Sequence, residues 1–159
     1  AYHGVTFDRN DALDTLVDMM MHRMNLTYTR STVVEGESVK WNGSDVPPSL
    51  RAVVNHCIER GAYKAFRGNT AGHFAFKVDD STFVTSKRKT NFNNLTDVGM
   101  VRVVAKDKDS VIAYGAKPSV GGQSQRIVFA EHPDMDCIVH FHCPPKTQVV
   151  PTRPQKYFE

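Results

Sequence analysis

The stretch CIVHFHCP at residues 137–144 decides how this chain is interpreted. It is short, apolar and rich in β-branched residues, and Pro144 and Pro145 close it, which predicts a buried β-strand. Side chains alternate between the two faces of a strand. One face is expected to lie in the core and carries Cys137, Val139 and Phe141. The other face carries Ile138, His140 and His142.

His140 and His142 stand two residues apart at the end of this strand, so their imidazoles can converge on one ion. Neutral imidazole nitrogen suits Zn²⁺ and similar divalent metals, with a Zn–N distance of about 2.0–2.1 Å. Both are therefore candidate metal ligands. The alternative on spacing alone is a pair of solvated histidines at a strand exit. A weaker alternative is a structural zinc site that includes Cys143, because structural sites have four ligands, commonly with Cys.

Composition limits the class of protein. The 159 residues are enough for one domain with its own core, and 40% are hydrophobic and 23% charged. The net charge of +3 is mild, and aromatic and basic residues do not interleave, so neither a nucleic acid nor a membrane partner is predicted. No apolar run reaches the roughly 18–20 residues that span a bilayer. The odd count of three cysteines indicates reduced thiols in a cytoplasmic protein.

Hydrophobic periodicity gives an order of elements. Helices are predicted at residues 10–24, 48–60 and 123–131. Strands are predicted at residues 26–34, 73–78, 82–86, 100–105, 111–115 and 137–144. Successive strands joined by short polar turns form hairpins, so we expect a largely antiparallel sheet with helices packed on it. The Gly- and Pro-containing loop at residues 35–48 is the candidate boundary between an N-terminal helix–strand extension, or the tail of an upstream unit (1–46), and the main domain (47–159).

Several short motifs in the main domain follow a known order. They are TAGHFAFK at residues 70–77, VTSKR at 84–88, LT at 95–96, PSVG at 118–121, PD at 133–134 and VHFH at 139–142. In order and spacing, residues 48–145 resemble the class II aldolase/adducin superfamily. The resemblance implies an α+β fold with three α/β/α layers around a mainly antiparallel sheet. It also implies a homo-oligomer, usually a cyclic tetramer.

Enzymes of that family use a divalent metal, often zinc, held by three histidines. Two of them correspond to His140 and His142, and the third would lie beyond Glu159, so the resemblance implies that the C-terminal part of the domain is missing. The metal acts as a Lewis acid that stabilises an enediolate, and a glutamate moves the proton. Backbone amides and small hydroxyls hold the substrate's phosphate.

This sequence departs from the family at the glutamate position, which is Gly121. The family asparagine is His73, and a glycine-containing turn has become TSKR at residues 85–88. Loss of that glycine removes easy positive φ and close backbone approach to a phosphate. Thr85 and Ser119 are retained. Half of the metal site is therefore kept, the acid–base group is lost and residues expected to bind the phosphate are changed.

The resemblance supports a divergent metal-dependent lyase or epimerase acting on a small phosphorylated sugar or related carbonyl compound. His140 and His142 would bind the metal, and His73, whose ordinary pKa lies near neutrality, would carry the proton. Substrate-binding candidates are Thr85, Lys87, Arg88 and Ser119, with the two cations replacing backbone amides. The plainer explanation for His73 is a strand-end histidine with a satisfied hydrogen bond. The plainer explanation for residues 87–89 is a solvated basic loop.

The alternative hypothesis is a non-catalytic, adducin-like scaffold or protein-interaction domain. Fold does not fix function, and loss of the acid–base glutamate is what such divergence would produce. An exposed sheet edge would then need a partner, and the Met-rich helix predicted at residues 10–24 could supply an interface.

Overall fold

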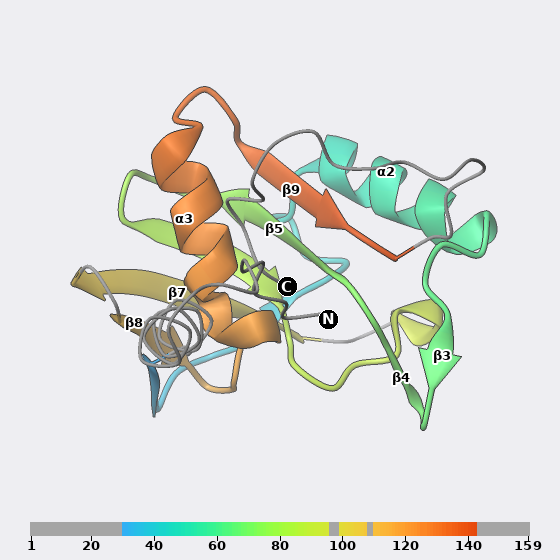
Figure 1. Ribbon diagram of the computed structural model, residues 1–159, viewed down its shortest axis with the longest axis horizontal. Coiled ribbons are helices and arrows are strands. Elements are labelled where there is room, and N and C mark those ends of the chain that lie inside the picture. The colour runs from blue at the N-terminus through green and yellow to red at the C-terminus, as the bar shows by residue number, and fades with distance from the viewer. Residues whose placement is uncertain (1–29, 96–98, 108–109, 143–159) are drawn as a thin grey trace, which may run out of the picture.

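The fold is described from a computed structural model, in which residues 30–95, 99–107 and 110–142 are described. The helix predicted at residues 10–24 and the first part of the strand predicted at 26–34 lie outside these residues. The helices, including two short 3₁₀ turns, are α2 (Pro48–Glu59), η1 (Phe92–Asn94), η2 (Ser119–Gly122) and α3 (Gln123–Glu131). The strands are β1 (Arg30–Val34), β2 (Val39–Lys40), β3 (Ala65–Phe66), β4 (Asn69–Thr70), β5 (His73–Lys77), β6 (Thr82–Ser86), β7 (Gly99–Asp107), β8 (Ser110–Tyr114) and β9 (Cys137–His140). Figure 1 shows their arrangement.

The main sheet has the strand order β1-β8-β7-β6-β5-β9, and β2 pairs with β7 from outside this path. β1 runs parallel to β8, and the other pairings in this sheet are antiparallel. The fold is therefore α+β with a mixed, mostly antiparallel sheet, which confirms the predicted class. The hairpins β5–β6 and β7–β8 also form where the sequence predicts them.

Local chemistry explains where these elements begin and end. Proline occupies the first position of α2, where a missing N–H costs nothing, and the helix ends before Gly61, whose φ is +71°. In the β5–β6 turn, the Asp79 carboxylate accepts hydrogen bonds from the backbone N–H and the hydroxyl of Ser81 at 2.9 and 3.0 Å. These bonds hold the pKa of Asp79 below its ordinary value.

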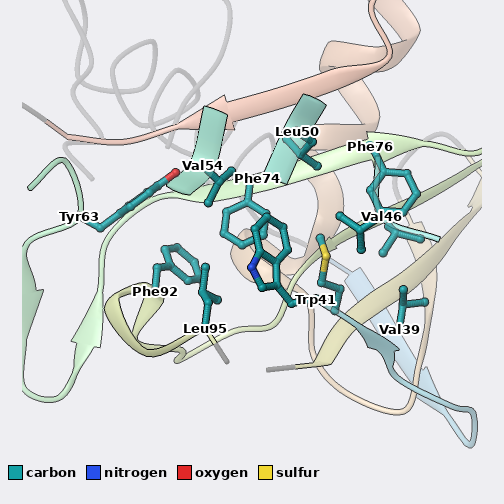
Figure 2. Close-up of a cluster of buried hydrophobic side chains, with 12 residues drawn as sticks. Val39, Trp41, Val46, Leu50, Val54, Tyr63, Phe74, Phe76, Phe92 and Leu95 are labelled. Atoms are coloured by element: carbon teal, nitrogen blue, oxygen red, sulfur yellow. The ribbon is translucent and has the colours of Figure 1, made fainter. Parts of the chain in front are cut away.

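The core consists of two clusters of buried side chains, and consecutive residues of β5 contribute to different ones. Phe74 and Phe76 belong to the first cluster and Ala75 to the second, because side chains alternate along a strand. The first cluster includes residues of α2, and the second includes Phe129 of α3. In Figure 2 the indole of Trp41 lies beside the ring of Phe74, and the two ring centroids are 4.9 Å apart.

Residues 30–46 take part in this sheet and core. They contribute β1 and β2, and three of their side chains are buried in the first cluster: Val39, Trp41 and Val46. The loop to α2 is held by Arg51, whose guanidinium donates to the carbonyl oxygen of Trp41 at 2.9 Å. This part of the chain packs as an extension of the sheet that follows it. The division at residue 46 itself stays a prediction.

β9 is not the buried strand that its sequence predicts. It lies at the end of the strand order and pairs with β5 (Figure 1). Of the residues expected in the core, Val139 packs against the first cluster, whereas Cys137 and Phe141 are exposed. An apolar run shows that a segment can be buried. Whether a strand lies inside the sheet or at the end of the strand order depends on its pairing with residues far away in the sequence, which an apolar run does not reveal. In the described part of the chain, no helix is long and apolar enough to cross a membrane.

Candidate metal and anion site

A pocket of about 220 Å³ gathers four separate segments of the chain. They are the turn between β4 and β5, the basic loop after β6, the start of η2 and the end of β9. The described residues that line it are Thr70, Ala71, Gly72, His73, Arg88, Lys89, Ser119, Val120, His140 and His142. Most of the predicted site residues thus come together although they are distant in the sequence.

Three histidines lie side by side in this pocket. Strand pairing places His73 of β5 directly opposite His140 of β9. Their rings stack, with centroids 4.9 Å apart and planes 13° apart. The rings of His140 and His142 also have centroids 4.9 Å apart, but their planes are nearly perpendicular, at 89°. His73 is buried, with 3% of its surface exposed, whereas His142 is exposed.

The ring planes decide which of these histidines can share a metal. An imidazole nitrogen binds a metal through a lone pair that lies in the ring plane. His73 and His140 are stacked, so the lone pairs of the two rings lie in separate, nearly parallel planes, which disfavours a shared ion. The rings of His140 and His142 are not stacked in this way, so these two residues remain the predicted metal pair. Among residues 30–95, 99–107 and 110–142, no group of three or more His, Cys, Asp or Glu side chains is arranged to hold a metal ion.

Gly72 allows the end of β9 to approach the turn before β5. Its φ is +109°, a conformation that side-chain-bearing residues rarely adopt. A Cβ atom at this position would overlap the carbonyl oxygen of His140 and would lie 3.0 Å from Cε1 of Tyr63. The ring of Tyr63 also meets Phe141 edge-on, with centroids 6.3 Å apart. The placement of His140 therefore depends on the absence of a side chain at Gly72.

The basic loop is fixed to its neighbours on both sides. The backbone N–H of Arg88 donates to the carbonyl oxygen of Lys117 at 3.0 Å. Further along, the carbonyl oxygen of Thr90 accepts hydrogen bonds from the N–H and the hydroxyl of Thr70, both at 3.1 Å. Between these contacts, Lys89 adopts a left-handed conformation with φ +57°. These bonds fix the backbone of the loop that carries Arg88 and Lys89 at the pocket.

The start of η2 is strained and supported by a buried polar network. Val120 has φ +41°, and the two glycines that follow are also left-handed. A β-branched residue in this region costs of order 1–3 kcal/mol, and such strain clusters at functional sites. Below the loop, Nε2 of Gln125 donates to the carbonyl oxygen of Ser119 at 3.3 Å and to the hydroxyl of Thr85 at 3.2 Å. The hydroxyl oxygens of Ser86 and Ser119 are 2.9 Å apart.

Two predicted substrate-binding residues are not brought to the pocket. Thr85 is fully buried, and its hydroxyl donates to the carbonyl oxygen of Phe74 at 3.2 Å. Lys87 is exposed and does not line the pocket. Conversely, sequence reasoning missed Thr70 and Lys89 as lining residues. The basic run was visible, but which of its members faces the pocket depends on the left-handed turn at Lys89.

The charge of the pocket favours anions. The described lining contains an arginine, a lysine and three imidazoles, and no carboxylate is among its described residues. Charge-assisted hydrogen bonds from Arg and Lys are the usual way in which side chains hold phosphate or carboxylate groups. A larger hollow of about 730 Å³, lined by residues from the β2 region, β7 and β8, has charges of both signs and contains none of the predicted site residues.

Comparison with known families agrees with this architecture. Residues 52–152 match the class II aldolase and adducin N-terminal domain, which is well over half of the chain. The chain belongs to this family. No curated protein and no solved structure matches it. In this class II aldolase/adducin domain, Gly121, which the motif order predicts at the position of the family glutamate, is buried within the left-handed segment of η2.

Proposed function

We propose that this domain binds a divalent metal, most simply Zn²⁺, beside a small phosphorylated carbonyl compound, and that it acts on that compound as a lyase or epimerase. The observation that carries the proposal is that one pocket joins His140 and His142 to the two cations of the basic loop, Arg88 and Lys89. Membership of the class II aldolase/adducin family supports it.

In this proposal His140 and His142 hold the metal, and the remaining ligands come from outside the described residues. A divalent metal, when bound, supplies Lewis acidity that polarises a carbonyl oxygen. Arg88 and Lys89 hold the phosphate by charge. His73, buried against His140, carries the proton that the family glutamate would otherwise move, because an imidazole has a nitrogen that can accept a proton and one that can donate it.

A non-catalytic binding or scaffold domain is the second candidate. The observation in its favour is that no carboxylate is among the described residues that line the pocket, so the usual acid–base group of the family has no direct substitute there. The pocket would then bind an anion without transforming it.

Exchange of protons with solvent separates the two candidates. Dihydroxyacetone phosphate is incubated in D₂O with the zinc-supplemented protein, and loss of its carbon-bound protons is followed by NMR. We expect the wild type to exchange these protons about 10² to 10⁴ times faster than a His73→Phe variant. A His56→Phe variant, altered on the exposed surface of α2, is the control and should match the wild type. Absence of exchange above the buffer rate in the wild type would overturn the catalytic proposal in favour of the binding domain.

The same proposal extends to the wider architecture. The two core clusters, one including α2 and the other including α3, support three layers around the sheet. The pairing of β1 with β8, and of β2 with β7, supports a domain that includes residues 30–46. A tetramer and a cytoplasmic location are proposed from the family resemblance and from the cysteine content respectively.

A further inference from the structure

A buried glutamine lies beneath the histidine pocket, the pocket that the three histidines line. Gln125 is the third residue of α3, and its side chain is fully buried. Its Nε2 donates to the hydroxyl of Thr85 on β6 at 3.2 Å and to the carbonyl oxygen of Ser119 at the start of η2 at 3.3 Å. Its Oε1 accepts from the hydroxyl of Ser124 at 3.3 Å. One buried amide thus ties together two segments that are distant in the sequence.

The two segments that Gln125 joins lead into two walls of the pocket. β6 runs into the loop that carries Arg88 and Lys89, and η2 begins with Ser119. The segments also meet directly, because the backbone N–H of Arg88 donates to the carbonyl oxygen of Lys117 at 3.0 Å. The amide of Gln125 therefore supports, from inside the fold, the pairing that places the basic loop beside η2.

The wall formed by η2 is in a conformation that needs such support. Val120 has φ +41° and ψ +27°, and Gly121 after it is also left-handed. A β-branched residue is an outlier in this region, and such strain persists only where the surrounding structure determines it. The carbonyl of Ser119 belongs to the peptide group just before Val120, so its bond from Gln125 acts where the strain is held.

From these contacts we propose that Gln125 is a positioning residue for the anion site. It holds the basic loop and η2 in the arrangement that binds phosphate, and it is not itself among the described residues that line the pocket. The inference rests on the proposed function in one respect, namely that Arg88 and Lys89 hold the ligand's phosphate.

The variant Gln125→Met tests this role, because it keeps the length of the side chain and removes the hydrogen bonds of the amide. Calorimetric titration of the full chain with inorganic phosphate should show affinity about fivefold or more below that of the wild type. Gln123→Met is the matched control. Gln123 is a buried glutamine in the same turn of α3, and its Oε1 accepts from Nε of Arg126 at 3.1 Å. This control should leave phosphate affinity within about twofold of the wild type.

Hydrogen exchange measures the positioning without any ligand. The reporters are the backbone N–H of Arg88, bonded to Lys117, and that of Gly121, bonded to the carbonyl oxygen of Pro118 at 3.1 Å. In Gln125→Met we expect both to exchange about tenfold or more faster than in the wild type. The amides of β7, which lies between β6 and β8 in the sheet, are the internal reference and should change much less.

A milder variant keeps the test decisive if Gln125→Met does not fold. Thr85→Val removes the hydroxyl that accepts one of the two bonds from Gln125 and leaves the bond to Ser119 in place. Phosphate affinity and the protection of the Arg88 amide should both fall, by less than in Gln125→Met. Wild-type values of both in Thr85→Val would count against the proposal.

The outcomes separate failure of this inference from failure of the proposed function. Wild-type phosphate affinity in a folded Gln125→Met protein would overturn the positioning role while leaving the anion site in place. An equal rise in exchange throughout β7 would overturn it too, because the glutamine would then support the fold as a whole. Absence of phosphate binding by the wild type would overturn the anion site on which the proposed function depends, and this inference with it.

Discussion

His73 and His140 stack across the β5–β9 strand pair, with ring centroids 4.9 Å apart and planes 13° apart. This contact distinguishes the proposed proton carrier, His73, from the proposed metal ligand, His140, which the residue types alone do not. The stacking disfavours a metal ion shared by His73 and His140, whereas the perpendicular rings of His140 and His142 remain the predicted metal pair. His73 therefore lies beside the proposed metal ligands, where it supports the ring of His140 and is the proposed group for proton transfer.

The variant His73→Phe keeps an aromatic ring for the stack and removes both nitrogens. We expect the bound metal to stay within about twofold of the wild-type content, because His73 is not a ligand in this geometry. The measurement is elemental analysis of the purified variant, with its fold checked by circular dichroism. Loss of the metal from a folded His73→Phe protein would show that His73 does bind it.

The variant Gly72→Ala should be strongly destabilising. Its Cβ would overlap the carbonyl oxygen of His140, and the alanine would also have to adopt φ +109°. Gly61→Ala is the matched control, because φ is +71° there but nothing lies within 4 Å of the added Cβ. We expect urea unfolding to show a loss of about 1 kcal/mol for the control and at least about twice that for Gly72→Ala. Equal losses at both sites would argue against close packing of Gly72 on β9.

The variant Lys89→Gly separates stability from anion binding. Relief of left-handed strain, about 1–2 kcal/mol, is largely offset by the backbone entropy of glycine, about 0.5–1 kcal/mol. The free energy of unfolding should therefore change by less than about 1 kcal/mol, while the affinity for inorganic phosphate falls severalfold. Arg67→Gly, at the exposed left-handed position φ +49° between β3 and β4, should leave phosphate affinity unchanged. Equal effects of both variants on phosphate binding would contradict a role for Lys89.

The variant Tyr63→Phe tests the buried hydroxyl beside the histidine pocket. This hydroxyl has no hydrogen-bond partner in the described part of the structure, so its removal should leave stability at neutral pH unchanged or raise it by about 1 kcal/mol. Burial, with a smaller contribution from Cys57, raises the pKa of Tyr63 above its ordinary value of 10.0. The stability linked to the neutral phenol is then fully present below pH 10 and is lost as the pH rises above it.

Wild type should therefore lose stability more steeply than Tyr63→Phe in denaturant unfolding measured above pH 10. Parallel pH profiles for the two proteins would rule out this linkage. A drop of more than about 1 kcal/mol for Tyr63→Phe at neutral pH would indicate that the hydroxyl does have a partner.

Local patterns predicted much of the fold because their causes are local. The apolar stripe of α2, with Pro48 at its start and Gly61 after its end, defines that helix, and the turn at residues 79–81 marks the β5–β6 hairpin. α3 begins and ends where its periodicity predicts, at Gln123 and Glu131. The burial of β9 was predicted wrongly because an edge position depends on which strand pairs with which, and no local pattern encodes that.

The site was predictable only in part for the same reason. Spacing identified His140 and His142 as a pair, and the basic run identified Arg88. The stack of His73 on His140 follows from strand register, and the position of Lys89 follows from a left-handed turn held by hydrogen bonds to other segments. Thr85 was expected to touch substrate, but the pairing of β6 with β5 and β7 places it beneath the pocket, where its hydroxyl accepts from the side chain of Gln125, forty residues away.

Metal content is the most direct test of the proposal that His140 and His142 form a metal-binding pair. Protein purified without chelator is measured by elemental analysis beside the double variant His140→Ala, His142→Ala and the surface control His56→Ala. We predict about one zinc, manganese or iron ion per chain in the wild type and the control, and near none in the folded double variant. A folded wild type that neither carries nor takes up such a metal, or a double variant that retains it, would contradict the proposal.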